Sequence, residues 1–444
     1  MSGKLYAAAA VVDITPPVGT DLHGFPREEL SCGVLERLQA GVLFLRNGDE
    51  QLVLITADLI GIPPALTRSV RTALRRNLGV SPSSVMLAAT HTHCGPVILP
   101  GMIWLLKPPD KKYLEELKDK LLAAVLSAQR RLAPARLGAG TGACRFNINR
   151  RVRTRDGMVM APNRRGVCDH EVGVLRVDDE RGDVKTLVVN FTCHPTVTGG
   201  LLISPDYPGF MRKHLVKRYR RKPGVLFVTG ACGNIRPCVL DSAGEFRTGT
   251  TEDLERLGSD LAAEVFRVAA SIKTCPNIAL RGASAPVRLP LARPSARRLE
   301  REIDEYERNL KILAAENKPR LHSLIEEWKL RRTRRLHAFA KSGRNIVSIP
   351  AEIQLFAIGD IRLVGLPGEV FCEIGLHAKK LLGPARTFVV GYANSCPGYI
   401  PTAAALDEGG YEPAESYKGY GLPAPYAPAV EKTILDGVRK AAGI

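Results

Sequence analysis

Short apolar runs alternate with longer amphipathic segments along nearly the whole chain, and this alternation limits the possible folds most strongly. Short apolar runs bounded by glycine or proline are typical of buried strands, whereas apolar residues recurring every three or four positions are typical of helices. The runs that predict strands are 7–14, 40–46, 51–58, 84–90, 136–142, 172–178, 185–192, 224–230, 277–289, 346–357, 361–366 and 387–392. The segments that predict helices are 64–78, 110–132, 207–220, 251–272, 295–340, 371–382 and 428–441.

This pattern predicts an α/β fold with mixed β-sheets and flanking helices. A chain of 444 residues with 45% hydrophobic residues can bury a large core, and no low-complexity linker divides it. We therefore expect a single large domain over residues 1–444. Within it, residues 293–344 are highly charged and are broken midway by Asn-Lys-Pro, which predicts an inserted helical hairpin.

The net charge of +18 is concentrated in residues 213–223 and in the predicted hairpin. Acidic and basic residues alternate along the hairpin, as is typical of a solvated, ion-paired helical face. A patch that binds nucleic acid or an anionic membrane is the alternative. Aromatic residues are rarely interleaved with these charges, so the solvated face is favoured and no nucleic-acid partner is expected.

Three features predict a cytoplasmic location. No apolar run approaches the roughly 20 residues that a membrane-spanning helix needs. The N-terminal "MSGKLYAAAAVVDITPP" contains a short apolar stretch without a convincing cleavage site, and it is interpreted as the first strand rather than a signal peptide. The ten cysteines show no CxxC pairs or regular spacing, which favours reduced thiols.

The sequence "LAATHTHCGP" at 87–96 places His91 and His93 where an apolar strand gives way to a Gly-Pro turn. Side chains two apart on a strand share a face, so we expect both imidazoles to emerge together. Ligand sites of α/β proteins usually lie at the C-terminal ends of strands. The alternative is a pair of hydrogen-bonded loop histidines without a ligand.

Two further strands end in a residue that can bind a metal. "VVNFTCHPT" ends in His194, and "RLVGLPGEVF" places Glu369 in a Pro-Gly turn before a predicted helix. Taken alone, such a histidine is usually an ordinary polar residue, and such a glutamate is usually favourable helix electrostatics. Together, two histidines and a carboxylate with an open fourth position are a common ligand set for catalytic zinc.

An ordered set of motifs covers essentially the whole chain and resembles the catalytic domain of neutral, non-lysosomal ceramidases. The motifs are "VVDITPPVGTDLHGFPR", "LVLITADLIGI", "ATHTHCGP", "FNINRR", "NFTCHPT", "GACGNIRP", "LPGEVF" and "YANSCPGYIPTAAALDEGGYEP". The resemblance implies a mixed α/β domain that holds one zinc ion per chain. It also implies hydrolysis of an amide that links a fatty acid to a sphingoid base.

The resemblance assigns the metal ligands to His91, His194, Glu369 and Tyr399. A tyrosine is an uncommon ligand, because its phenol ionises near pH 10 unless a dication lowers that value.

The resemblance also assigns residues that act on the substrate. His93 is expected to face the scissile carbonyl and, with Tyr411, to stabilise the oxyanion or relay a proton. Arg150 is expected to orient or neutralise the substrate.

Asn234 and Arg236 are expected to bind the substrate. Ceramidases carry a serine with an assigned catalytic role at the position of Arg236, so a serine nucleophile at that point is excluded here. The guanidinium favours an anionic substrate over a neutral lipid.

The sequence therefore predicts a zinc-dependent hydrolase that acts on an amide of a small or lipid-like N-acyl substrate. One alternative keeps the metal but hydrolyses an ester, a lactone or an anionic N-acyl compound. The other alternative is a non-catalytic scaffold that binds an anionic partner through its basic helical hairpin.

Overall fold

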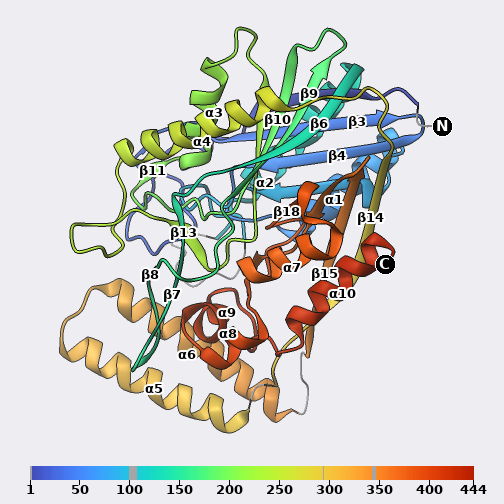
Figure 1. Ribbon diagram of the computed structural model, residues 1–444. Helices are drawn as coiled ribbons and strands as arrows, with labels where there is room; N and C mark the ends of the chain where they lie inside the picture. The colour runs from blue at the N-terminus through green and yellow to red at the C-terminus, as the bar shows by residue number, and fades with distance from the viewer. Residues whose placement is uncertain (1–2, 100–107, 294, 343–346) are drawn as a thin grey trace.

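The computed structural model describes residues 3–99, 108–293, 295–342 and 347–444, and it contains two large β-sheets with helices on their outer sides (Figure 1). The larger sheet has eight strands in the order β12-β10-β9-β6-β1-β3-β4-β5, and the smaller has four in the order β14-β15-β16-β18. The strands of the larger sheet are β1 (Tyr6–Asp13), β3 (Gln39–Asn47), β4 (Glu50–Ala57), β5 (Val85–Ala89), β6 (Ala133–Ala143), β9 (Glu171–Asp179), β10 (Val184–Phe191) and β12 (Gly224–Thr229). Those of the smaller sheet are β14 (Leu280–Pro290), β15 (Ser348–Ile358), β16 (Ile361–Gly365) and β18 (Thr387–Val390).

The two sheets pack face to face, and helices bury their other faces. Strand β3 is continuously apolar because both of its faces are buried. Leu43 lies in the core between the sheets, whereas Val42 and Phe44 lie in the core under the helices. From the smaller sheet, Phe356 and Phe388 fill the shared core. The helices are α1 (Pro64–Leu78), α2 (Lys111–Arg130), α3 (Tyr207–Lys217) and α4 (Thr251–Ser271) on the larger sheet, and α7 (Cys372–Leu382) and α10 (Val430–Ala442) on the smaller. Both sheets contain parallel and antiparallel pairs, so the predicted mixed α/β class is confirmed.

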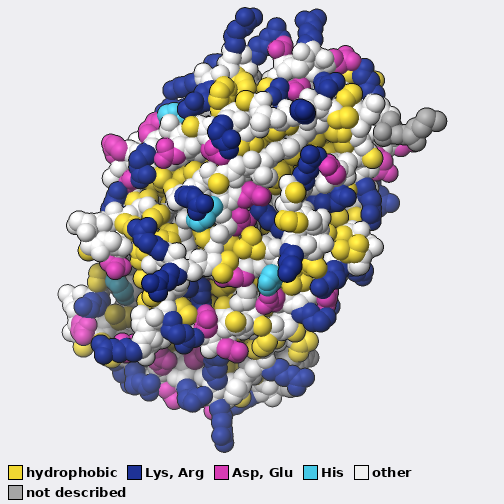
Figure 2. Space-filling model, in the orientation of Figure 1, with side chains coloured by type: hydrophobic (Ala, Val, Ile, Leu, Met, Phe, Trp, Pro, Cys, Tyr) yellow, Lys and Arg dark blue, Asp and Glu magenta, His cyan; other side chains and the backbone are white. Residues whose placement is uncertain are grey.

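Two helices, α5 (Ala296–Ala315) and α6 (Arg320–Lys341), lie within the predicted hairpin and connect the adjacent antiparallel strands β14 and β15. Residues 294, 343 and 344 of the predicted range lie outside the described residues, and the status of the hairpin as an insertion stays a prediction. Ion pairs join the two helices, including Arg334 with Glu307 at 2.6 Å. On the face shown in Figure 2, basic and acidic side chains are interspersed over the molecule.

The sequence pattern missed a small polar sheet and several short elements. Strands β7 (Asn147–Thr154) and β8 (Gly157–Asn163) form this sheet with β13 (Ile235–Pro237). Strand β7 buries arginines against carboxylates instead of apolar side chains, so hydrophobic periodicity could not reveal it. The other missed elements are β2 (Gly33–Val34), β11 (Leu202–Ile203), β17 (Glu369–Val370), β19 (Tyr399–Ile400), α8 (Ala403–Glu408), a π-helix (Tyr411–Glu415), α9 (Ser416–Gly419) and the 3₁₀ turns Pro82–Ser84 and Pro384–Arg386.

No helix in the described part of the chain combines the length and apolarity that membrane crossing requires. The cytoplasmic location stays a prediction.

The two large sheets are joined at one end by the segment after β18. Ala88 of β5 forms a β-bridge with Ala393. The Asn394 side chain accepts a hydrogen bond from the Leu87 backbone N–H at 3.0 Å and donates one to Gln354 Oε1 at 2.7 Å. These contacts hold the C-terminal end of β5 beside the chain that leaves β18.

A buried ion pair between Asp58, after β4, and Arg212 of α3 tests how strongly this scaffold depends on its polar contacts. Two hydrogen bonds of 2.5 and 3.1 Å join the fully buried carboxylate to the guanidinium. Asp58→Ala leaves Arg212 buried without its partner and is expected to lower the free energy of unfolding by about 3–5 kcal/mol. Asp13→Ala, which breaks the exposed pair with Arg37, is expected to cost less than about 1 kcal/mol. Urea unfolding of both variants measures the difference, and equal losses would contradict it.

Candidate metal centre

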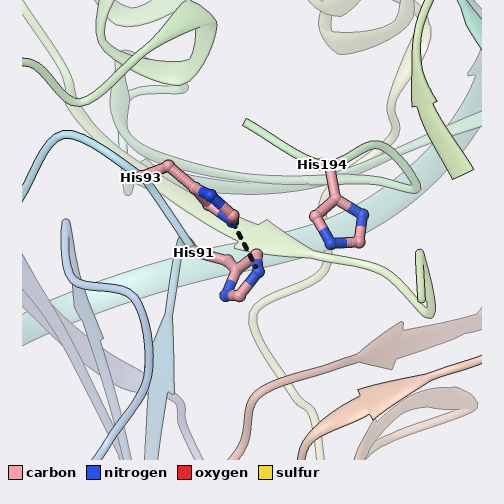
Figure 3. A group of neighbouring side chains, drawn as sticks. All are labelled: His91, His93 and His194. Carbon is pink, nitrogen blue, oxygen red and sulfur yellow. Dashed lines mark hydrogen bonds between the residues drawn. The ribbon is translucent and has the colours of Figure 1, made fainter. Parts of the chain in front are cut away.

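His91 and His93 lie just beyond β5, which ends at Ala89. These residues do not continue the extended backbone of the strand, because the His91 backbone is left-handed, with φ of 69°. The two rings nevertheless meet: their Nε2 atoms lie 3.1 Å apart, with the ring planes at 83° (Figure 3). A turn in the backbone, rather than strand periodicity, therefore brings the imidazoles together.

His194 and Glu369 complete a buried cluster with these histidines. His194 follows β10, and Glu369 begins the short strand β17. Glu369 Oε2 lies 2.9 Å from His194 Nε2 and 3.2 Å from His91 Nε2. One ring nitrogen from each of the three histidines also lies within 4.8 Å of the others, a grouping that can hold a metal ion (Figure 3).

The ring orientation of His91 and His194 is set by backbone carbonyls. His91 Nδ1 lies 2.5 Å from the Ile60 oxygen, and His194 Nδ1 lies 2.8 Å from the Ile235 oxygen. Because a carbonyl only accepts, each Nδ1 carries the proton. In the neutral ring the lone pair then lies on Nε2, the atom that faces Glu369. Metal-binding histidines are held by contacts of this kind.

His93 differs from the other two histidines in its surroundings. Its Nδ1 is buried and has no hydrogen-bond partner among the described residues, and its ring packs against Phe25 with centroids 4.7 Å apart. Arg27 donates a hydrogen bond of 2.8 Å to the His93 backbone oxygen and so fixes the main chain there. Burial, together with the neighbouring His91 and His194, lowers the pKa of His93 well below its ordinary value. Because its Nδ1 has no acceptor in the described part of the chain, no backbone carbonyl there fixes the His93 tautomer.

Two tyrosines that the sequence analysis missed support this cluster. Tyr420 donates a hydrogen bond from its hydroxyl to Glu369 Oε1, the oxygen that does not face the histidines. Tyr392 stacks on His91 with ring centroids 4.0 Å apart, and its own backbone is left-handed. Burial alone would raise the pKa of Glu369, but His91 and His194 hold it well below its ordinary value. Sequence spacing carries no signal for either tyrosine, because their contacts arise from the packing of distant segments.

Tyr399 lies beside Glu369, since the two are paired in register across the parallel strands β17 and β19. Its ring is stacked near His194, with centroids 6.3 Å apart. Arg150 donates a 3.0 Å hydrogen bond to the Tyr399 hydroxyl, a 2.8 Å bond to the Gly233 oxygen and a 2.8 Å bond to Glu412. These contacts hold the Arg150 guanidinium against the Tyr399 hydroxyl, and its predicted contact with substrate stays a prediction.

The three remaining predicted residues lie at different depths. Tyr411 is 40% exposed, and its ring meets Tyr399 edge-to-face at 5.8 Å. Asn234 is buried, and its side chain contacts the start of α7, accepting from the Cys372 N–H and donating to Glu373. Arg236 lies over the Phe246 ring at 4.2 Å. The predicted substrate contacts of Asn234 and Arg236 stay predictions.

Two comparisons with known proteins find similarity to neutral ceramidases. The chain is similar to the neutral ceramidase of Pseudomonas aeruginosa, with 29% identity over 231 residues, or 47% of this chain. That alignment spans 33% of the relative's length. No family model matches the chain.

Solved structures show the same fold. The crystal structure of neutral ceramidase from Pseudomonas aeruginosa superposes with a TM-score of 0.71 at 20% identity, covering 100% of this chain and 74% of the other. A structure described as ceramidase complexed with C2 gives the same TM-score and identity, covering 98% of this chain and 75% of that one. The resemblance predicted from the motifs is confirmed.

Tyr420→Phe tests whether the cluster is a built metal site. Removing the hydroxyl removes the hydrogen bond that orients the Glu369 carboxylate. Losing a hydrogen bond to a metal ligand typically weakens metal binding by about 10- to 100-fold. We expect that loss in zinc titrations against a competing chelator. Tyr426→Phe is the matched control, because its hydroxyl contacts the Pro397 backbone oxygen at 3.0 Å. Equal zinc affinity in both variants would contradict the prediction.

Proposed function

We propose that this protein is a hydrolase that cleaves an amide bond of an N-acyl compound and uses one zinc ion per chain. The observation that carries the proposal is the convergence of His91 Nε2, His194 Nε2 and Glu369 Oε2. In neutral rings all three atoms are hydrogen-bond acceptors, and a cation is the group that satisfies converging acceptors. Two histidines and a carboxylate with an open position match a catalytic zinc site.

Tyr399 is our candidate for the fourth ligand. Burial and the Glu369 carboxylate raise the pKa of the Tyr399 phenol well above its ordinary value, whereas the Arg150 guanidinium opposes that shift. A nearby dication favours the phenolate much more strongly. Arg150 therefore has a positioning role: its hydrogen bond aims the Tyr399 oxygen, and Glu412 balances its charge.

The remaining groups are suited to the substrate. When bound, zinc polarises a carbonyl and lowers the pKa of water toward 7. His93 stays neutral near pH 7 because its pKa is depressed, so its ring can donate one hydrogen bond and accept a proton at the other nitrogen. We assign it to the reacting carbonyl. Tyr411, the most exposed of the predicted site residues, lies at the entrance, where it contacts the substrate.

The similarity to neutral ceramidase supports an amide as the scissile bond. We do not assign ceramide as the substrate. Ceramidases carry a serine at the position of Arg236, and the arginine is larger and positively charged. An ester or lactone hydrolase and a non-catalytic scaffold are outcomes that the following experiment separates.

Chelator treatment of the purified protein tests the proposal directly. We expect about one zinc per chain by elemental analysis and hydrolysis of N-acyl amides that a chelator abolishes and zinc restores. His194→Ala combined with Glu369→Ala is expected to remove both metal and activity. Turnover of matched esters but not amides would reassign the reaction. Salt-sensitive binding to a polyanion without chelator-sensitive turnover would favour the scaffold.

His91→Ala and His93→Ala are expected to behave differently although the two rings touch. His91 has the backbone-bonded Nδ1 of a ligand, so its variant is expected to lose metal. The His93 variant is expected to keep metal and lose about 10²- to 10³-fold in kcat, as for loss of one oxyanion donor. Elemental analysis and steady-state kinetics of both variants measure this. Equal metal loss would mean that both histidines bind the ion.

A further inference from the structure

Arg236 is a half-buried cation for which the described part of the chain provides no hydrogen bond or ion pair. Its Nε is buried without a partner, and its guanidinium lies over the Phe246 ring, 4.2 Å from the centroid. The aromatic face supports the positive charge but supplies no oxygen acceptor. Burying the Nε donor unpaired is costly, so the side chain is suited to an anionic ligand.

The strand that carries Arg236 runs next to residues that contact the candidate metal centre. It is paired with Ile148 across the antiparallel strands β13 and β7, and Arg150 lies two residues further along β7. Although β7 is irregular between Asn149 and Arg151, the Arg150 backbone N–H still donates a 3.0 Å hydrogen bond to the Asn234 oxygen, so the two strands stay side by side there. Arg150 reaches the Tyr399 hydroxyl from this region, and the Ile235 oxygen holds His194 Nδ1. The residue before Arg236 therefore contacts His194, and a residue two places from its cross-strand partner contacts Tyr399.

The charges around Arg236 are unbalanced. Glu412 pairs with both Arg150 and Arg151, at 2.8 and 2.9 Å, so this carboxylate is already shared between two guanidinium groups. Burial, followed by the charge of Arg150, lowers the pKa of Arg236 to about 10, which still leaves it positive at neutral pH. The positive charge of Arg236 thus has no counterpart among the residues that the structure describes.

We infer that Arg236 binds an anionic oxygen group of the substrate, so that the preferred substrates are N-acyl compounds with a carboxylate or phosphate close to the amide. The inference rests on the proposed function and names its substrate class. A guanidinium presents a planar fork of donors that matches either group. Neutral N-acyl lipids lack the group that this fork would pair with.

The test compares two substrates that differ only in charge. N-dodecanoylglycine carries a carboxylate, and N-dodecanoylglycinamide replaces it with a neutral amide. We expect Arg236→Gln to raise KM for the carboxylate by about 10- to 100-fold, with little change in kcat or in KM for the neutral compound. N-dodecanoyl-phosphoethanolamine is the third substrate and carries a phosphate. Whichever of the two anionic substrates shows the larger rise in KM identifies the anion that Arg236 binds.

Three controls separate binding from folding. Arg153→Gln removes the same charge from the exposed end of β7 and is expected to leave all three KM values unchanged. Arg236→Lys keeps the charge without the fork and is expected to give an intermediate KM. Circular dichroism and thermal midpoints are expected to match the wild type. Equal KM changes for the charged and neutral substrates, in a folded variant, would overturn the inference.

Calorimetric titration of N-dodecanoylglycine into metal-free protein keeps this test independent of turnover. A 10-fold or greater loss of affinity in Arg236→Gln relative to wild type supports the inference, and equal affinities overturn it. Failure of the proposed function gives a different result, because the wild type then hydrolyses none of the three substrates in a chelator-sensitive manner.

Discussion

The site depends on one physical constraint: acceptor atoms from three distant segments meet in a buried volume. His194 and Glu369 are 175 residues apart, yet His194 Nε2 and Glu369 Oε2 lie 2.9 Å apart. Backbone carbonyls hold the far side of His91 and His194, and Tyr420 holds the far oxygen of Glu369. The surrounding contacts direct the acceptors toward one another, which is the arrangement that a cation stabilises.

Strained backbone at the junction of the two sheets accompanies this arrangement. His91, Tyr392 and Asn394 all have positive φ, a conformation that costs of order 1–3 kcal/mol for residues other than glycine. The strain persists because Asn394 is hydrogen-bonded to both sheets, to the Leu87 backbone of one and to the Gln354 side chain of the other. The buried hydrogen bonds thus hold His91 and Tyr392 in the stacked pair that faces the cluster.

Much of the fold and part of the site could be predicted from the sequence. Hydrophobic periodicity located the principal strands and helices to within a few residues, because their apolar faces are buried. The hairpin of β7 and β8 escaped, since β7 buries arginines in ion pairs whereas Val159 and Met160 of β8 are exposed. His194 and Glu369 could be selected because each follows a buried strand, but the contact of Tyr420 with Glu369 spans 51 residues and leaves no local pattern.

The sequence by itself determined the chemistry of the donors and the strand ends where they lie. Imidazole and carboxylate at the ends of buried strands are properties of residue type and hydrophobic pattern, and both are local. Only the tertiary structure decided which ring nitrogen faces inward, because Ile60 and Ile235 supply carbonyls from remote segments. It also decided that Arg150 pairs with Glu412 whereas Arg236 pairs with no described residue, since charge pairing depends on distances that only packing sets.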